Sequence, residues 1–430
     1  LQQESLSTTV PLGKLSPHIP VVPKGMPMSA AKDYTVRATH CSHKAPRDEI
    51  YRKLVEITAP LDRSWQKIEQ ARRIGIKINM QMRSDNIRRI GGRRQELVDD
   101  DVMWAVLRLL RERSDAEIFA LDTSSAPPGA RPGDDFNTGP LLEEFDVAYV
   151  EAGDPPFARY EVPGGGIMFS QYQLSAALGE ADAFVSLAKM KNHGFMGITL
   201  CLKNLFGLPP IPPHGRLRTY FHHVIRLSYV LPDLGLIAKP CLNIIDGLTG
   251  QARMEWDGEG RIGDCLIAGD HVIATDACGS HLMGTDPRLD WPTPPFRRDR
   301  SPVAVAAEHG FGTVDLDEID FAMEGLEPPV AEFDSAEVDP AEQIAILRQT
   351  ASEQALFYRD NRERILDAHA GNYVFLQDGE VIWSGLKPQE AGAVQNVAAG
   401  KKDQAVWLKQ ADPEEREGEQ MSVYEKILAV

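Results

Sequence analysis

The chain has 430 residues, of which 43% are hydrophobic and 25% are charged, an ordinary composition for a folded globular protein. Its formal net charge of −17 argues against nucleic acid as a main partner, because phosphate backbones select basic surfaces. No run of 18 apolar residues occurs, so we expect no membrane span, and five widely spaced cysteines argue against a four-cysteine metal or iron–sulfur site. The first residue is Leu, which leaves open a cytoplasmic protein or one exported after removal of an N-terminal signal.

The first predicted elements follow residues 1–35, a stretch rich in Ser, Thr, Pro and Gly that is typical of an extended arm. Apolar spacing predicts a helix over 47–72 that is broken at Pro60, then a strand at 73–79. A helix at 99–113 with an acidic start and a strand at 117–122 come next. This alternation predicts a parallel sheet with right-handed crossovers.

The same pattern continues to about residue 325. We expect strands at 145–150, 183–188, 242–246 and 264–268, and helices at 171–179, 215–230, 272–283 and 302–309. The prolines of 286–300 predict an irregular segment. Residues 36–325 therefore predict an α/β domain, with a mostly parallel sheet, flanking helices and two lobes around a cleft.

Residues 326–430 predict a small α+β module. A helical region at 340–368 is followed by two β-rich runs within 373–383, and Asp378-Gly379 between them is a strong hairpin signal.

The densest group of chemically useful side chains lies just after the strand predicted at 183–188. Ligand sites form at the carboxyl ends of parallel strands, where the following KMKNH would be placed. His193 is suited to be an acid, a base or a metal ligand, and Lys203, near a predicted helix start, to bind an anion or act as a nucleophile. The alternative is a solvated lysine-rich loop with an ordinary polar histidine. Lys189, Lys191, Asn192, His193, Thr199, Lys203 and Asn204 lie within sixteen residues.

Other polar residues are predicted at strand ends or in helices. Lys77 and Asn79 end the strand at 73–79, while Asp122 and Asp246 end two others, so all four are expected at one sheet edge; the alternative is turn or capping chemistry.

Helix geometry limits the remaining candidates. Of His222 and His223, neighbours in a predicted helix, at most one faces the site. Asp270 is predicted as a helix N-cap, and Asp276 lies inside that helix. Five arginines between 83 and 94 favour a solvated or salt-bridged patch over an anion site.

The segment KMKNHGFMGITLCLKNLFGLPP resembles the signature of the DUF362 family, Lys-x-Lys-x-His followed by Thr-Leu-x-x-Lys-Asn-Leu-Phe-Gly. RIGIKINM, LNIIDGL and LIAGDHVIATDACGSHLMG agree with further family segments in the same order, so the resemblance covers about residues 73–312. It implies a fold and a site but no settled reaction, and this chain lacks the ferredoxin cysteines of many members. Residues 370–386 are similar to a DUF5678-like hairpin module. The order of His, Gly-rich segment and Lys is distantly similar to lactate racemase-like proteins, in which such groups hold a nickel pincer cofactor.

These observations predict an enzyme that acts on a small anionic molecule by proton or hydride transfer, isomerase- or racemase-like or an oxidoreductase, with its cofactor unknown. His193 and Lys203 are the predicted catalytic residues, and Asp246 and Asp276 would orient cations or hold a metal. The predicted ligand-binding residues are Lys77, Asn79, Lys191, Thr199, Asn204, His222 and Asp122. The alternatives are a non-catalytic cofactor- or metal-binding protein, and a structural or assembly subunit. The latter would use the arm and the C-terminal module to bind a protein partner or form a homo-oligomer.

Overall fold

The computed structural model describes residues 32–80, 86–123, 138–212, 214–216, 218–336, 340–391 and 406–429. The chain divides into two compact units, Leu1–Lys32 and Asp33–Val430, and every element below belongs to the second. The predicted arm at 1–35 lies almost wholly outside the described residues. The predicted division at residue 326 stays a prediction.

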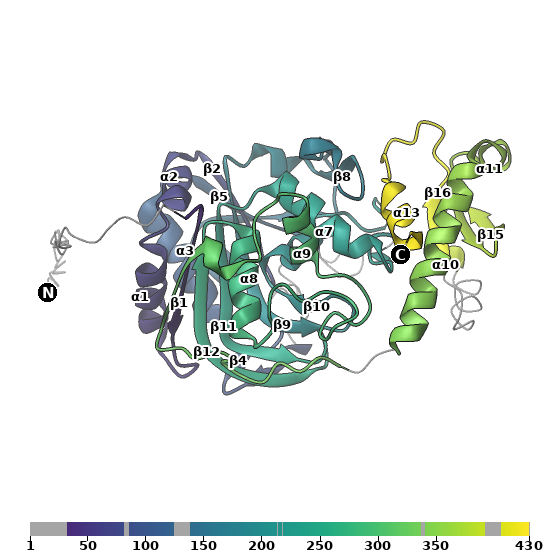
Figure 1. Ribbon diagram of the computed structural model, residues 1–430. Coiled ribbons are helices and arrows are strands. Elements are labelled where there is room, and N and C mark those ends of the chain that lie inside the picture. The colour runs from purple at the N-terminus through teal and green to yellow at the C-terminus, as the bar shows by residue number, and fades with distance from the viewer. Residues whose placement is uncertain are drawn as a thin grey trace, which may run out of the picture. The chain divides into compact units, whose positions relative to one another are not determined.

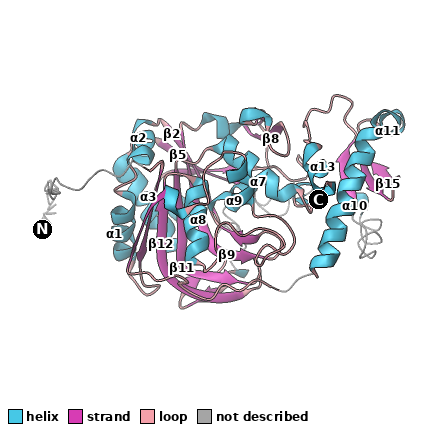
Figure 2. Ribbon diagram, viewed as in Figure 1, coloured by secondary structure: helices cyan, strands magenta, loops and turns pink. Residues whose placement is uncertain are grey.

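A large mixed sheet forms the centre of the second unit (Figure 2). In the part of the chain that the structure describes, its order is β13–β1–β12–β11–β9–β2–β5–β6, and β10 pairs with β9. The run from β11 to β6 is parallel throughout, whereas β12 is antiparallel to both of its neighbours. The strands are β1 (Tyr34–His40), β2 (Arg73–Ile78), β5 (Glu117–Asp122), β6 (Val147–Glu151), β9 (Ala183–His193), β10 (Gly197–Thr199), β11 (Leu242–Ala252), β12 (Glu259–Gly269) and β13 (Ile319–Glu324).

Helices cover both faces of this sheet, which confirms the predicted α/β fold (Figure 1). One apolar core joins the sheet to α1, α2 and α3, and a second joins its other face to α5, α7, α8 and α9. Because side chains alternate along each strand, strands buried on both faces are apolar throughout, as in AFVSLA of β9. The helices are α1 (Arg47–Thr58), α2 (Asp62–Gln70), α3 (Asp100–Arg113), α4 (Gly139–Glu144), α5 (Cys201–Asn204), α6 (Arg218–Phe221), α7 (Arg226–Ala238), α8 (Val272–Leu282) and α9 (Pro302–Glu308).

Three predicted elements differ from the structure. Residues 171–179 are not a helix: Gln171–Ser175 form β8, paired with β7 (Phe157–Glu161), and a 3-10 turn follows at Ala176–Glu180. Tyr172 and Leu174 point inward with a period of two, so the strand pattern prevails. β9 continues through KMKNH to His193, because β10 and β11 supply pairing partners there. The predicted helix 215–230 is divided into α6 and the start of α7.

The C-terminal residues form a helical and β-sheet layer, as predicted. The helices α10 (Ala341–Asp360), α11 (Arg362–His369) and α13 (Ser422–Leu428) accompany a sheet with the order β15–β14–β16. Its strands are β14 (Tyr373–Gln377), β15 (Glu380–Gly385) and β16 (Trp407–Gln410). Asp378 and Gly379 both have positive φ, 53° and 72°, which confirms the hairpin turn. No helix among the described residues has the length and apolar character needed to cross a bilayer.

Candidate functional site

The carboxyl end of β9 carries the central side chains of the candidate site. Lys189, Lys191 and His193 alternate with apolar or amide residues and therefore share one side of the strand. All three are buried. The lysines are thus structured members of a strand rather than parts of a solvated loop.

Lys189 has a structural partner. Its Nζ lies 2.9 Å from Asp246 Oδ2 and 3.1 Å from Thr249 Oγ1, and both charged side chains are fully buried. Asp246 Oδ2 also accepts the backbone N–H of Asp99, which is the N-cap residue of α3. Burial raises the pKa of Asp246. The pair therefore attaches α3 to the sheet and leaves no free ammonium.

Lys77 and Asp122 form a second buried pair, at 2.9 Å, where β2 and β5 end. Lys77 Nζ donates to Asn204 Oδ1 at 3.1 Å, and the Asn204 amide donates to the carbonyl of Lys77 at 2.9 Å. Burial lowers the pKa of Lys77 and raises that of Asp122 to about 6. Three predicted site residues therefore meet at one sheet edge, held by one another.

His193 is held as a neutral imidazole. Its Nδ1 accepts the backbone N–H groups of Phe195 and Met196 at 3.0 and 3.1 Å, so the proton of the neutral ring lies on Nε2, 3.5 Å from Glu255 Oε1. Burial, with Lys203 and other nearby cations, lowers the pKa of His193 well below its ordinary value. The ring can thus donate a hydrogen bond from Nε2 but is a poor proton acceptor.

His222 stacks on His193, with ring centroids 5.4 Å apart, and lies 4.8 Å from the ring of Phe195. Burial and neighbouring cations lower its pKa to about 3. His223 instead bonds to the carbonyl of Val406 at 2.7 Å. Of the two adjacent histidines, His222 contacts His193 and His223 does not, which agrees with the expectation that at most one of them faces the site.

Lys203, in the short helix α5, differs from the other lysines of the site. Among the described residues its ammonium makes no hydrogen bond or ion pair, and it lies 4.6 Å from the centroid of the Phe206 ring. The exposed Arg218 guanidinium lies over the same ring, at 5.3 Å. Burial, followed by the charge of Arg218, lowers the pKa of Lys203 to about 7. The site therefore contains two adjacent cations, and among the described residues no carboxylate is bound to either.

Lys191 is a further buried lysine of β9. Its Nζ donates to the carbonyls of Glu96 and Glu255, at 2.9 and 3.3 Å, and sits 4.3 Å above the ring of Trp256. Burial lowers its pKa to about 8. Trp256 itself is 39% exposed.

Four residues of the site follow no pattern that marks them in the sequence: Arg218, Glu255, Trp256 and Phe206. Phe206 lies within the KNLFG motif, and Arg218 lies within the helix predicted at 215–230 that also holds His222. Neither residue has a spacing to other polar residues that would indicate a site. Glu255 and Trp256 belong to a turn between β11 and β12 that only the hairpin pairing brings back over β9.

The remaining predicted site residues are Asn79 and Thr199, which were expected to bind a ligand, and Asp276, which was expected to hold a metal. Asn79 Oδ1 and Thr199 Oγ1 are buried without a hydrogen-bond partner in the described structure. Asp276 accepts the backbone N–H groups of Cys201 and Leu202, at 2.9 and 2.8 Å, at the start of α5. Burial raises its pKa to about 7. Asp276 therefore positions the helix that carries Lys203.

The described residues contain no group of three or more His, Cys, Asp or Glu side chains arranged to hold a metal ion. The metal role of Asp246 and Asp276 stays a prediction, and each carboxylate has backbone donors of its own. The predicted N-cap Asp270 is corrected: His271 caps α8, and Asp270 accepts the backbone N–H of Thr35.

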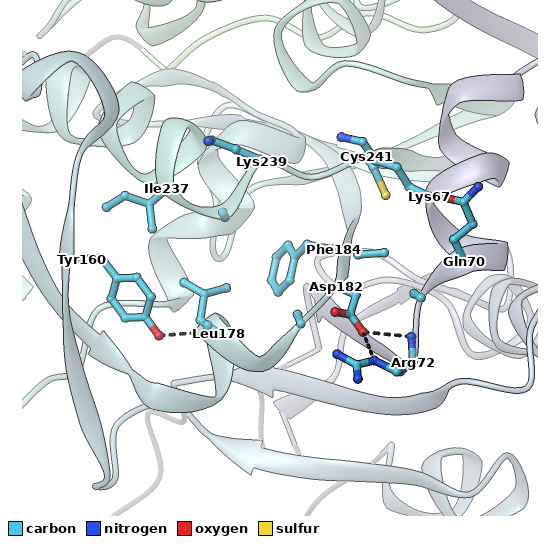
Figure 3. A pocket seen from close by; sticks show the side chains of 15 residues that line it. Lys67, Gln70, Arg72, Tyr160, Leu178, Asp182, Phe184, Ile237, Lys239 and Cys241 are labelled. Carbon is cyan, nitrogen blue, oxygen red and sulfur yellow. Dashed lines mark hydrogen bonds and ion pairs between the residues drawn. The ribbon is translucent and has the colours of Figure 1, made fainter.

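A cavity of about 590 Å³ lies away from all these residues, at the amino ends of β2, β9 and β11 (Figure 3). Phe184 and Tyr160 line it, and Asp182 there accepts the backbone N–H groups of Arg72 and Arg73. Lys67 and Lys239 at its rim are exposed surface lysines. None of the predicted site residues lines this cavity.

Comparison with known proteins agrees with the family resemblance. The family described as "Domain of unknown function (DUF362)" matches residues 74–281. A thylakoid-associated protein of Synechocystis sp. is 26% identical over 202 residues, which are 45% of this chain and 59% of that protein. The match therefore spans less than two thirds of the relative. The similarities to DUF5678 and to lactate racemase-like proteins stay predictions.

Proposed function

We propose that this protein, whose residues 74–281 belong to the DUF362 family, is an enzyme that moves a proton on a small carboxylate or phosphate ester. The observation that supports the proposal is the Lys203 ammonium, with a pKa of about 7, beside the exposed Arg218, since neither cation has a carboxylate partner in the described part of the chain. A lysine with this pKa is partly unprotonated at neutral pH and can accept a proton from carbon.

The residues would divide the reaction between them. Arg218 would bind the anionic group through charge-assisted hydrogen bonds. The neutral Lys203 amine would take a proton from the carbon next to the activating carbonyl and become an ammonium. The Nε2–H of His193 would donate to the enolate oxygen that forms, and Lys203 would return the proton to the neighbouring carbon, which completes an isomerisation. The Lys203 amine and the Nε2–H of His193 are groups suited to move protons, so we favour proton transfer over hydride transfer.

Solvent deuterium exchange tests the proposal without knowledge of the substrate. The protein is incubated in D₂O with a panel of 2-hydroxy, 2-amino and 2-oxo carboxylates and sugar phosphates, and proton NMR detects the loss of C–H signals. We expect exchange in at least one compound, its loss in Lys203→Gln, and normal exchange in Lys239→Gln, which removes an exposed lysine at the opposite sheet edge. Arg218→Gln is expected to raise KM by about ten- to hundredfold.

A direct titration makes the result decisive. The rate of Lys203 acetylation, followed by peptide mass spectrometry across pH, gives the pKa of that single amine. A value near 10, or exchange that is unaffected in Lys203→Gln, refutes the proposal. Stoichiometric binding of a panel compound, with no exchange in any, supports a non-catalytic binding protein instead.

A further inference from the structure

The segment from Arg216 to Arg226 has two faces with different partners. Arg218 and His222, four residues apart, lie against Phe206 and His193 of the candidate site. Arg216, Tyr220 and Arg226 instead contact residues of the C-terminal chain, between 373 and 424. The same short stretch therefore connects the site to a part of the chain nearly two hundred residues away.

Glu417 is the centre of the first contact. Its Oε1 accepts Arg216 Nε at 2.8 Å, and its Oε2 accepts the hydroxyl of the fully buried Tyr220 at 2.6 Å. Arg216 also donates to Gln410 Oε1 at 2.6 Å. One carboxylate thus holds residues on both sides of Arg218.

Glu419 is the centre of the second contact. Its Oε1 accepts Arg226 Nε at 2.8 Å, and its Oε2 accepts Lys409 Nζ at 3.0 Å. The Glu419 and Arg226 side chains are fully buried. The charges of Arg226 and Lys409 outweigh burial and lower the pKa of Glu419 to about 2. Glu419 thus stays ionised and attaches the first residue of α7.

The backbone between these contacts is strained. Ile225 has a φ of 79°, a left-handed conformation that β-branched residues rarely adopt and that costs about 1–3 kcal/mol. Such a conformation persists only where the surroundings impose it. Arg226, the next residue, is held by Glu419 and by the carbonyl of Leu408.

We propose that Glu417 and Glu419 are positioning residues, through which the C-terminal residues hold Arg218 and His222 in place at the site. Residues 406–429 then act as an integral part of the site rather than as an independent appendage. This inference rests on the proposed function, because it assigns a role to Arg218 beside Lys203.

Glu417→Gln tests the inference, with Tyr220→Phe as a second variant that removes only a hydroxyl. Arg218 is one of the cations that depress the pKa of Lys203, so a less firmly held Arg218 allows that pKa to rise. We expect the acetylation midpoint of Lys203 to increase by about 0.5 pH unit or more, a threefold change in protonation constant. Glu425→Gln is the matched control, since Glu425 pairs with Arg359 and contacts neither Arg216 nor Tyr220.

The outcomes separate the two proposals. A Lys203 midpoint near 10 in the unaltered protein overturns the proposed function. A midpoint near 7 that Glu417→Gln and Tyr220→Phe leave unchanged overturns the positioning role alone, even if both variants melt at a lower temperature. A rise in both variants, with no rise in Glu425→Gln, supports it.

Discussion

Replacing Lys189 by Met will destabilise the fold in a pH-dependent way. The substitution leaves the fully buried Asp246 without its cation, and breaking one partner of a buried pair costs about 3–5 kcal/mol. We expect a value near 3 kcal/mol, because Asp246 keeps the backbone N–H groups of Asp99 and Leu248. Exposed pairs cost less than about 1 kcal/mol, and Lys53→Met, which removes the partner of the half-exposed Glu56, is the control.

The sign of the pH dependence follows from Asp246. Burial raises its folded-state pKa above the unfolded value, and loss of Lys189 raises it further. A raised carboxyl pKa stabilises the fold at low pH, and this stabilisation is lost as the pH rises through the folded-state pKa. The deficit of Lys189→Met relative to the unaltered protein is therefore smaller at pH 5 than at pH 8.

Urea unfolding monitored by tryptophan fluorescence measures these differences. Adding Asp246→Asn to Lys189→Met removes the unpaired charge and is expected to recover at least about 1 kcal/mol. If the double variant is as unstable as the sum of its two single variants, or if the deficit does not change with pH, the two side chains are not energetically coupled and the reasoning is wrong.

Three further predictions concern the surroundings of the site. Because Asp276 has a folded-state pKa of about 7, the unaltered protein should lose about 4 kcal/mol of stability between pH 4 and 7. Asp276→Asn removes this carboxyl and should not show that loss, which urea unfolding at several pH values checks. Lys203→Met should raise the melting temperature most below pH 7, where the fold must bury a charged amine, and the gain should disappear toward pH 10. Gly207→Ala places a methyl group against Asp122 Oδ1 and should cost about 1–3 kcal/mol, whereas Gly139→Ala, with open space around it, should not.

The order of strands and helices could be read from the sequence because it depends on local patterns. Strands buried on both faces are largely apolar, as in the first half of β9, and Asp378-Gly379 has the backbone freedom that a two-residue hairpin turn needs. The same local reasoning failed at Gln171–Ser175, where short helical and strand patterns overlap and the pairing with β7 decides the conformation.

The candidate site was only partly predictable. Lys77 and Asp122 meet at one edge because parallel strands end together, as the alternation of strands and helices implies, whereas Asn204 reaches them from α5. The sequence could not predict which lysines are paired with a carboxylate. Lys189 pairs with the buried Asp246, whereas Lys203, fourteen residues later, has no such partner among the described residues.

The sequence by itself determined the fold class, the resemblance of residues 74–281 to the DUF362 family and the segment that carries the imidazole and ammonium groups, because each is recorded in neighbouring residues. Only the tertiary structure decided the protonation states and the hydrogen-bond and ion-pair partners of these imidazole and ammonium groups. The pKa of a buried group depends on its burial and on the charges around it. For Lys203 and His193 the fold sets both, through desolvation and through neighbouring cations that include Arg218. The tertiary structure also decided that Glu417 and Glu419, far along the chain, contact the segment that bears Arg218.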